Sequence, residues 1–268
     1  MASASKGNFV WYEHLTRDVG AATAFYAEVV GWKTQPFGDD YRMWVGSQGP
    51  LGGVMKLEGE AAKVGTPPQW MAHVQVDDLD RAVATVRELG GKVWKEPTQI
   101  PTVGRFSVIA DPQGAVLSLF QPEAPMTTHD PAKDGEFCWN ELLTSDSAAA
   151  FRFYAELFGW RSLQEMDMGP MGTYRIFGIG EQRLGGMMTA PKENPMPPMW
   201  VYYASTSDLD AALGRATSKG AKVLNGPMEV PGGGRIAQLV DPQGAVFALH
   251  QAPRTWRART SRSPIAQR

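Results

Sequence analysis

The sequence predicts an α+β protein built from two similar halves, and three observations support this. The segment FVWYEHLTRDVGAATAFYAEVVGW from Phe9 returns as FCWNELLTSDSAAAFRFYAELFGW from Phe137, 128 residues later. The segment GRFSVIADPQGAVLSLFQ from Gly104 returns as GRIAQLVDPQGAVFALHQ from Gly234, 130 residues later. Strand-like and helix-like patterns also follow one another in the same order in both copies. Such agreement indicates a duplicated domain, and the period is too long for a solenoid or a propeller.

The first copy opens with a unit of one strand, one helix and three strands. Residues 9–16 alternate and are rich in aromatic side chains, which is typical of a strand. Asp18 follows as a helix N-cap, because its carboxylate can accept backbone N–H groups. Apolar residues then recur at helical spacing until Gly31, which ends the helix. The unit is expected to close with strands at 32–36, 41–46 and 54–57.

A second unit repeats this order after an expected loop at residues 58–68. A strand over 70–76 precedes a helical stripe over 79–89, which Gly90-Gly91 ends. The segment Asp111-Pro112-Gln113-Gly114 predicts a turn, since Pro fixes φ and Gly can adopt a positive φ. The closing strands of this unit are expected at 92–94, 105–110 and 115–121.

The second copy follows the same plan, with Asp146 as the cap of its first helix. Helices are expected at 149–158 and from Leu209, and strands at 139–144, 174–178, 186–189, 200–205 and 245–251. The domains are predicted at 8–122 and 136–252, joined by a linker at 123–135 that is rich in Pro, Thr and Asp. Residues 253–268 are expected to form a basic, flexible tail.

The composition excludes several classes of protein. The chain has 268 residues and a net charge of −2, which gives no electrostatic case for nucleic acid or an anionic membrane as a partner. No apolar run is long enough to cross a membrane, and the N-terminus lacks an apolar signal core, so we expect a cytoplasmic protein. The single cysteine, Cys138, excludes an internal disulfide, and its apolar strand context favours a buried, inert thiol.

These motifs together resemble the vicinal oxygen chelate superfamily, the glyoxalase, bleomycin-resistance and dioxygenase group. The resemblance rests on a strand followed by Asp and a helix that contains FY and ends in G-W, and on the later DLD and DP-Q-G-A segments. The pattern W-x-E-L and the segment FYAELFGW are most similar to two-domain glyoxalase-like proteins of the hydroxylase-labelled type. The resemblance covers about residues 8–122 and 136–252. It implies that the two βαβββ units of each half pair into a curved mixed sheet around a cleft.

Metal enzymes of that family carry His, Gln or Glu at four cleft-facing strand positions. In this sequence the resemblance places those positions on Trp11, Met55, Met71 and Ser118, and in the second half on Trp139, Met188, Val201 and Ala248. None of them is a His or a carboxylate, and neither half gathers the three or four N or O ligands that a divalent ion needs. We therefore predict no metal and no other cofactor. The alternative is a weak metal site made by His73 with Glu13, or by His250 with Glu141.

Glu13 and Glu141 are the first candidates for chemistry. Each lies two residues after a tryptophan of the predicted cleft, so it shares that face of its strand. A carboxyl group beside Trp in an apolar cleft would have a raised pKa and could act as a general acid or base. The alternative is structural, because hydrogen bonds to the backbone or to Arg would hold the sheet, and duplication alone explains why both halves carry one.

Two histidines are the next candidates. His73 shares strand parity with Met71, and Tyr203 stands at its position in the second half. His250 lies near the end of the last strand, where the first half has Phe120. These differences indicate two different pockets or one functional pocket, although a lone strand His is more often a packed or surface group. His14 and His129 are given no role.

The ligand-binding candidates are mostly apolar and lie at the predicted cleft positions. They are Trp11, Trp139, Met71, Tyr203, Met55, Met188 and Phe120, together with Arg105 and Arg235. Arginines at repeated positions could clamp a carboxylate or a phosphate of a ligand. We favour instead an ion pair between these arginines and Glu13 or Glu141.

The sequence therefore predicts a glyoxalase-like protein that binds a small organic molecule in an aromatic cleft, as a monomer or a homodimer. The first hypothesis is metal-independent acid–base catalysis, as in an isomerase, lyase, cyclase or aldehyde-detoxifying enzyme, with Glu13 or Glu141 as proton carrier. The second is a binding protein that sequesters its ligand, with tryptophans as stacking walls. The third is a divalent-metal enzyme of the glyoxalase or dioxygenase type.

Overall fold

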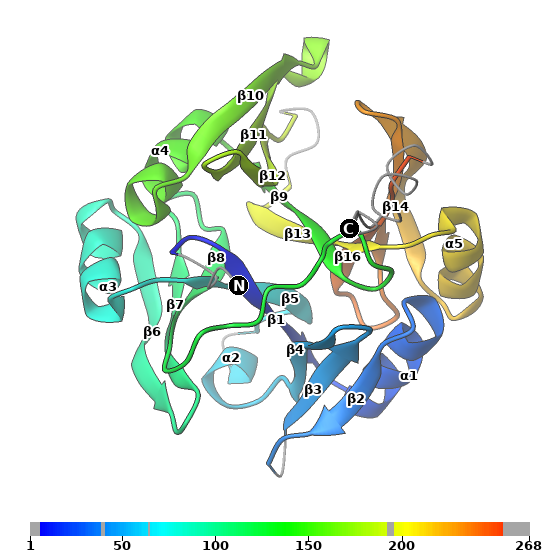
Figure 1. The fold of residues 1–268 in the computed structure, drawn as a ribbon, viewed down its shortest axis with the longest axis horizontal. Helices are drawn as coiled ribbons and strands as arrows, with labels where there is room; N and C mark the ends of the chain where they lie inside the picture. The colour runs from blue at the N-terminus through cyan, green and yellow to red at the C-terminus, as the bar shows by residue number, and fades with distance from the viewer. Residues whose placement is uncertain (1–5, 39–40, 64, 192–195, 254–268) are drawn as a thin grey trace, which may run out of the picture.

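The computed structural model describes residues 6–38, 41–63, 65–191 and 196–253. It contains two eight-stranded sheets, one from each half of the chain, with the helices on the outside of the molecule (Figure 1). The basic tail expected at 253–268 lies outside the described residues, apart from residue 253.

The first half contains both expected units. Its elements are β1 (Phe9–Thr16), α1 (Val19–Val29), β2 (Lys33–Pro36), β3 (Tyr41–Gly46), β4 (Gly49–Lys56), α2 (Gly59–Lys63), β5 (Gln69–Gln75), α3 (Leu79–Glu88), β6 (Lys92–Ile100), β7 (Gly104–Ala110) and β8 (Val116–Pro122).

The second half repeats this order, with a short 3₁₀ turn at Gly169–Met171. Its elements are β9 (Phe137–Thr144), α4 (Ser147–Phe158), β10 (Arg161–Asp167), β11 (Thr173–Ile179), β12 (Gln182–Thr189), β13 (Met199–Ser205), α5 (Leu209–Ser218), β14 (Lys222–Val230), β15 (Gly234–Val240) and β16 (Val246–Gln251).

Each sheet is mixed, as the resemblance implies. The strand order of the first sheet is β2-β3-β4-β1-β5-β8-β7-β6, and the second sheet has the equivalent order. The two units of a half therefore meet at its two central strands, where β1 pairs antiparallel with β5 and parallel with β4. The prediction of two tandem α+β halves with curved mixed sheets is confirmed.

The local signals act as the sequence indicates. The side chain of Asp18 accepts a hydrogen bond from the backbone N–H of Ala21 at 2.9 Å, and Asp146 does the same for Ala149 at 2.9 Å. Gly31 and Gly159 follow the two helices with φ of 86° and 77°, a conformation that glycine adopts without steric cost.

Several boundaries differ from the expectation, and those of β4 and β6 have a clear physical reason. The segment 58–68, expected as a loop, contains the short helix α2. Strand β4 begins at Gly49 rather than at residue 54, because its glycines give no apolar alternation that could reveal a strand. Strand β6 continues to Ile100 although it contains Pro97, since shifts of register between Val93 and Thr98 let the strand pass the missing N–H group.

One continuous core joins the two halves. Tyr12 of β1 stacks on Phe137 of β9 with ring centroids 3.8 Å apart, and its hydroxyl donates to Asn140 Oδ1 at 3.0 Å. The hydroxyl of Tyr202 in β13 accepts the backbone N–H of Ala72 in β5 at 2.9 Å. Buried side chains from both sheets belong to the same apolar cluster. The helix-side faces of the sheets are thereby filled. The opposite face of each sheet carries Glu13 or Glu141 and is termed the first cleft in the first half and the second cleft in the second half.

The two Asp-Pro-Gln-Gly turns tie each half to the other. Asp111 Oδ1 accepts three backbone N–H groups of its own turn, as expected for a structural aspartate. Its Oδ2 accepts the hydroxyl of Tyr154 at 3.1 Å, and Asp241 Oδ2 accepts the hydroxyl of Tyr26 at 3.2 Å. Each turn therefore accepts the hydroxyl group of a buried tyrosine that lies on a helix of the other half.

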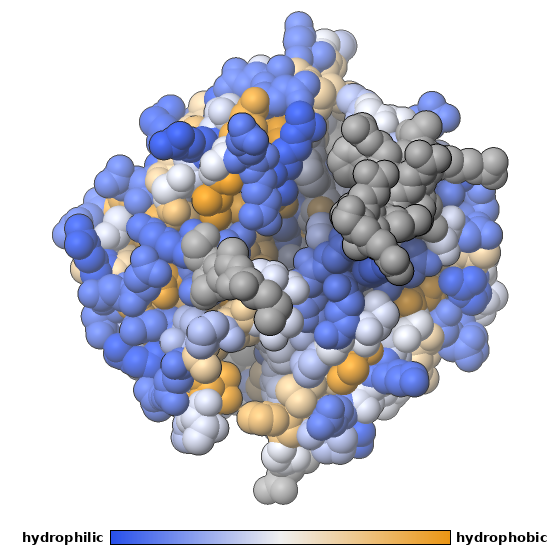
Figure 2. All heavy atoms as spheres, viewed as in Figure 1, coloured by the Kyte–Doolittle hydropathy of each residue, from blue (hydrophilic) through white to orange (hydrophobic). Residues whose placement is uncertain are grey.

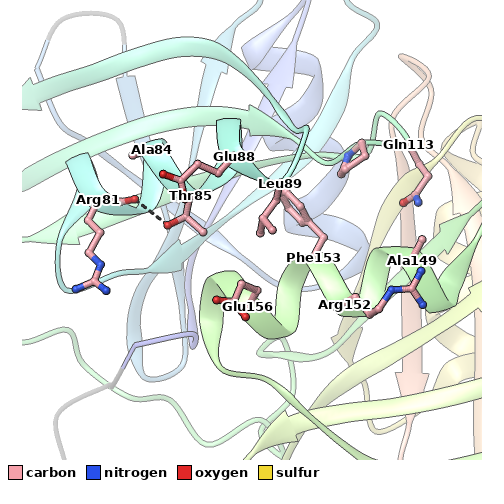
Figure 3. Close-up of a pocket in the computed structure, with 11 residues that line it drawn as sticks. Arg81, Ala84, Thr85, Glu88, Leu89, Gln113, Ala149, Arg152, Phe153 and Glu156 are labelled. Carbon is pink, nitrogen blue, oxygen red and sulfur yellow. Dashed lines mark hydrogen bonds between the residues drawn. The ribbon is translucent and has the colours of Figure 1, made fainter.

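Helices from different halves pair along two sides of the molecule, α1 with α5 and α3 with α4 (Figure 1). Between α1 and α5, Arg215 donates to the backbone oxygens of Glu28 at 2.8 Å and Val29 at 3.2 Å. Thr85 stands at the equivalent place in α3, and its hydroxyl bonds within its own helix. A hollow of about 760 Å³ remains between α3 and α4, rimmed by charged side chains (Figure 3).

The visible face of the molecule is largely hydrophilic, with apolar side chains in scattered patches (Figure 2). Among the described residues, no helix combines the length and the apolar character that crossing a membrane requires.

Candidate active site

The candidate site of the first half lies on the sheet face that points away from the helices. Register places Glu13 of β1 beside Gly53 of β4 on one side and Met71 of β5 on the other. His73 of β5 stands beside Trp11 of β1, so it shares this face. These residues lie on the two central strands, and Glu13, Met71 and His73 are buried. The structure therefore gathers the residues that strand parity predicts.

A short chain of hydrogen bonds holds the Glu13 carboxyl group. The indole Nε1 of Trp11 donates to the hydroxyl oxygen of Tyr41 at 2.9 Å, and that hydroxyl donates to Glu13 Oε2 at 2.9 Å. Gly53 makes this possible, because a Cβ atom at that position would collide with the Tyr41 hydroxyl. The absence of a side chain at Gly53 in β4 therefore leaves room for the Tyr41 hydroxyl beside the Glu13 carboxyl group.

The second oxygen of Glu13 has no hydrogen-bond partner among the described residues. The residue is only 6% exposed, and burial raises the pKa of its carboxyl group to about 7, partly opposed by the hydrogen bond from Tyr41. Near neutral pH this group is present in both protonation states. A carboxyl oxygen without a hydrogen-bond partner and a pKa near 7 would allow this group to accept and release a proton.

His73 Nε2 lies 3.9 Å from Glu13 Oε2, which is longer than a hydrogen bond. Burial lowers the pKa of His73 to about 4, so the imidazole is neutral at pH 7 and the two groups do not form an ion pair. Its Nε2 has no hydrogen-bond partner among the described residues, and neither does Oε1 of the nearby Gln75. Buried polar atoms are nearly always paired, so Glu13 Oε1, His73 Nε2 and Gln75 Oε1 are exceptions that need an explanation.

The second cleft contains the same chain of three residues. Trp139 Nε1 donates to the Tyr174 hydroxyl at 2.9 Å, and Tyr174 donates to Glu141 Oε2 at 2.9 Å. Glu141 Oε1 is also occupied, because it accepts the Tyr203 hydroxyl at 2.9 Å and Gln238 Nε2 at 3.0 Å. Burial raises the pKa of Glu141, and these hydrogen bonds oppose the shift.

Two positions account for the difference between the clefts. Tyr203 stands where the first half has His73, and Gln238 stands where the first half has Val108. Tyr203 and Val201 also join a small apolar cluster on this face, with Trp139 packed against it. The second carboxyl group is therefore fully bonded in a filled cleft, whereas the first has a free oxygen.

The other predicted site residues fall in different places. Phe120 packs on His73, with ring centroids 5.9 Å apart, whereas Met55 lies at the rim and is 39% exposed. Met188 takes the place in the second half that Met55 has in the first, beside Leu143 of β9. His250 does not join Glu141, because its Nδ1 lies 3.6 Å from Cys138 Sγ.

Arg105 and Arg235 form ion pairs outside the clefts. Arg105 donates two hydrogen bonds to Asp80, at 2.8 and 2.9 Å, and Arg235 does the same to Asp210, at 2.7 and 2.9 Å. The expectation that these arginines pair with Glu13 or Glu141 is wrong. The arginines follow Gly104 and Gly234 at the starts of β7 and β15, where they face the first turn of the helix that precedes each strand in the chain, α3 and α5.

The sequence reading overlooked Tyr41 and Tyr174, although both stand in a repeated YR pair at matched positions. That repetition is the signal in the sequence that points to them. Gln75 and Gln238 offered no such signal, because the other half has Ser205 and Val108 at their positions.

Comparisons with known proteins agree with this architecture. The family model of the Glyoxalase/Bleomycin resistance protein/Dioxygenase superfamily matches residues 8–119 and 138–249. A Mycobacterium tuberculosis protein named "Putative glyoxylase CFP32" is 33% identical over 249 residues, which cover 89% of this chain and 92% of that protein. The "Anthracycline biosynthesis protein DnrV" of Streptomyces peucetius is 27% identical over 264 residues, with 93% and 94% of the two chains covered.

Two solved structures share the fold. The Mn(II)-bound glyoxalase from Novosphingobium aromaticivorans superposes with a TM-score of 0.64 at 16% identity, covering 94% of this chain and 83% of that one. The 2,2',3-trihydroxybiphenyl 1,2-dioxygenase from Sphingomonas wittichii gives a TM-score of 0.66 at 12% identity, covering 92% and 91%.

The donor set of this chain does not fit the metal that such enzymes hold. Among the described residues, no three His, Cys, Asp or Glu side chains converge in a way that could ligate an ion. In the first cleft Glu13 and His73 are the two donors of the His, Cys, Asp or Glu type, and their neighbours across the strands are Met71 and Ser118. Two donors fall short of the three protein ligands that a catalytic divalent ion usually needs.

Proposed function

Because the chain belongs to the glyoxalase/bleomycin resistance/dioxygenase superfamily, we propose that it is an acid–base enzyme for a small organic molecule, with its active centre in the first cleft and with no metal. The observation that carries this proposal is Glu13, a buried carboxyl group with one free oxygen and a pKa of about 7. Its counterpart Glu141 has both oxygens bonded. The duplication therefore supplies one catalytic centre and one structural copy of it.

The proposed reaction is a proton transfer next to a carbonyl group. Ionised Glu13 takes a proton from the carbon beside the carbonyl through Oε1. The electron pair of that C–H bond forms a C=C bond, and the π pair of the carbonyl moves to its oxygen. Where that carbon carries a hydroxyl group, protonated Glu13 then gives its proton to the former carbonyl carbon, and the hydroxyl proton passes to the former carbonyl oxygen, which completes an isomerisation. A base with a pKa close to the working pH suits both steps.

The neighbouring residues have distinct parts in this proposal. Tyr41 holds Oε2 and so fixes the direction in which Oε1 points. His73 is neutral at pH 7, and in the tautomer with its proton on Nε2 it can donate to the oxygen that gains charge. Trp11, Met71 and Phe120 form apolar walls that exclude water, which sustains the raised pKa of Glu13.

The test is solvent-deuterium incorporation into a panel of aldehydes and ketones in D₂O, followed by proton NMR. We expect exchange beside the carbonyl of at least one compound, and a rate that falls by about 10²–10⁴ in Glu13→Gln. Glu141→Gln is the matched control, and its rate should stay within about threefold of the wild type. Prior dialysis against a chelator should leave the wild-type rate unchanged.

Absence of exchange across the panel, or equal losses in the two variants, would contradict the proposal. Loss of exchange after dialysis, with recovery on adding a divalent ion, would contradict metal independence. These outcomes concern the first cleft alone, since the control variant changes the equivalent residue of the second.

A second candidate function rests on the walls of the cleft. Aromatic and Met side chains lie around Glu13, and one relative is named an anthracycline biosynthesis protein, so a flat aromatic ligand is a reasonable occupant. A protein that sequesters such a ligand would show no exchange in any compound. It would lose affinity in Trp11→Ala and keep it in Glu13→Gln, whereas the proposed enzyme loses turnover in the second variant.

A further inference from the structure

A hollow of about 340 Å³ lies where the two halves meet, and of the residues named for the two clefts it shares Trp11 alone. This volume is in the range of small-molecule sites. Equivalent residues of both halves line it, such as Leu51 with Leu184 and Asn8 with Glu136. Residues 125–129 of the linker also line it, and in Figure 1 the linker leaves β8 and crosses the middle of the molecule before β9. The chain has one linker, so this site exists once in the molecule.

The linker is held in place over the hollow. Gln48 donates to the backbone oxygen of Asp130 at 3.0 Å and accepts the backbone N–H of Asp130 at 3.0 Å. Further along, Gly135 N–H donates to Ser205 O at 2.8 Å, and Trp32 Nε1 donates to Gly135 O at 2.6 Å. The wall that the linker provides is thus fixed to both sheets.

The polar centre of the hollow is a pair that the linker creates. Glu136 is 1% exposed, and its Oε2 lies 2.7 Å from His129 Nδ1. With the Nδ1 proton donated to this carboxylate, His129 Nε2 is left as an acceptor. The other oxygen, Glu136 Oε1, has no hydrogen-bond partner among the described residues. Both free atoms of the pair therefore need a hydrogen-bond donor.

The charge of the pair also needs a complement. Buried carboxylates are normally paired with a cation, and in the tautomer with its single proton on Nδ1 the His129 imidazole bonds Glu136 without supplying a charge. Among the described residues that line the hollow, the remaining cation is Arg183, which is exposed and donates to Gln164 Oε1 at 3.1 Å. A ligand that brings its own positive charge and several N–H donors would satisfy both needs.

We propose that this hollow is a second binding site, for a protonated organic amine with an apolar ring. Its ammonium group would lie at Glu136 and His129, which accept its N–H donors. Phe9, Phe137, Met126 and Leu184 supply the apolar walls for the ring, and an ammonium beside aromatic rings gains a further attraction. The site contains neither Glu13 nor His73, although it shares Trp11 with the first cleft, and it does not depend on the proposed function.

The test uses tryptamine, with tryptophol as its neutral analogue and indole-3-acetate as its anionic analogue, in titration calorimetry on the full chain. We expect tryptamine to bind at least about tenfold more tightly than either analogue, because only it carries the positive charge. Glu136→Gln should weaken tryptamine binding at least about tenfold, and His129→Asn should weaken it in the same direction. Glu13→Gln, in the first cleft, should leave the affinity within about twofold.

Met126→Trp is a further variant that fills the hollow from the linker and leaves the carboxyl group in place. This variant should abolish tryptamine binding. If thermal unfolding shows that Glu136→Gln does not fold, Met126→Trp tests the proposal in its place. No tryptamine binding, equal affinity for the three compounds, or unchanged affinity in Glu136→Gln or Met126→Trp would overturn the proposal. A loss of affinity in Glu13→Gln would do so as well, since it would place the amine in the cleft.

Discussion

The two clefts share a Trp–Tyr–Glu chain and differ in what faces the second carboxyl oxygen. In the second cleft Tyr203 and Gln238 donate to it, and in the first it has no partner among the described residues. Both carboxyl groups are buried to a similar degree, so burial alone does not separate them. The difference is that side chains of the described residues donate hydrogen bonds to Oε1 of Glu141 and not to Oε1 of Glu13, the oxygen that the proposed reaction requires. Duplication preserved the Trp–Tyr–Glu chain in both halves, and the proposed function assigns the chemistry to the first.

Exchanging the residues that distinguish the clefts should have the largest effect. In the double variant His73→Tyr, Val108→Gln, the first cleft acquires the two donors of the second, so Glu13 loses its free oxygen. We expect the rate of deuterium exchange to fall by at least about 100-fold, measured by proton NMR as above. The reciprocal double variant Tyr203→His, Gln238→Val is the control. A swapped first cleft that still exchanges at the wild-type rate would refute the comparison.

The pH dependence of stability should reveal the free carboxyl group next. The pKa of Glu13 is raised from 4.5 to about 7 in the folded protein, so its contribution to stability is present below pH 4.5 and is lost as the pH rises through 7. Glutamine stays neutral, so the stability of Glu13→Gln relative to the wild type should rise by about 3 kcal/mol between pH 4 and pH 8. Urea unfolding across this range measures the difference. Parallel curves for the two proteins would show that Glu13 titrates normally.

A matched pair of substitutions compares Tyr203, which is hydrogen-bonded to Glu141, with His73, its counterpart beside Glu13, whose Nε2 has no partner among the described residues. Tyr203→Phe removes a donor from Glu141 and an acceptor from Gln238, and it should cost about 1–3 kcal/mol of unfolding free energy. His73→Phe removes a buried nitrogen that has no partner among the described residues, so it should be neutral or stabilising. Urea unfolding at pH 7 measures both. A larger loss in His73→Phe would mean that Nε2 has a protein partner after all.

The smallest effect is expected at the arginines. Arg105→Ala and Arg235→Ala remove exposed ion pairs to Asp80 and Asp210, which contribute little because solvent screens them. Thermal unfolding should hardly change, and binding of any ligand of the first cleft should stay within about twofold, as titration calorimetry can check. A clear loss of affinity in Arg105→Ala alone would mean that this side chain leaves Asp80 to meet the ligand.

The sequence was sufficient for the fold and for the sheet face on which the two glutamates lie. Period-2 parity places Trp11, Glu13 and His73 on one face once β1 and β5 are known to pair, and the repeat reveals the same for Trp139 and Glu141. The sequence was not sufficient for the difference between the clefts. Gln238 lies 97 positions from Glu141 in the chain, and only the assembled sheet shows that the two side chains meet.

The remaining failures have similar causes. His129 and Glu136 lie in and beside a linker without any periodic pattern, so no rule of strand or helix parity connects them. The arginines were assigned to the wrong carboxylates, because a residue at the start of a strand can reach a helix terminus that the sequence does not place nearby.

The Asp-Pro-Gln-Gly turns bear on how this molecule gains and loses its structure. Tyr26 finds its acceptor in Asp241, and Tyr154 finds its acceptor in Asp111, so neither half is complete by itself. A half made as a separate polypeptide would expose Tyr26 and Asp111 on one surface, in an arrangement that a second copy could satisfy reciprocally. We therefore expect the isolated first half to form a homodimer, and the full chain to unfold in a single cooperative transition. In a homodimer of single halves, every substitution changes both clefts. In the duplicated chain each cleft has its own codons, so the second cleft could change while the first kept its residues.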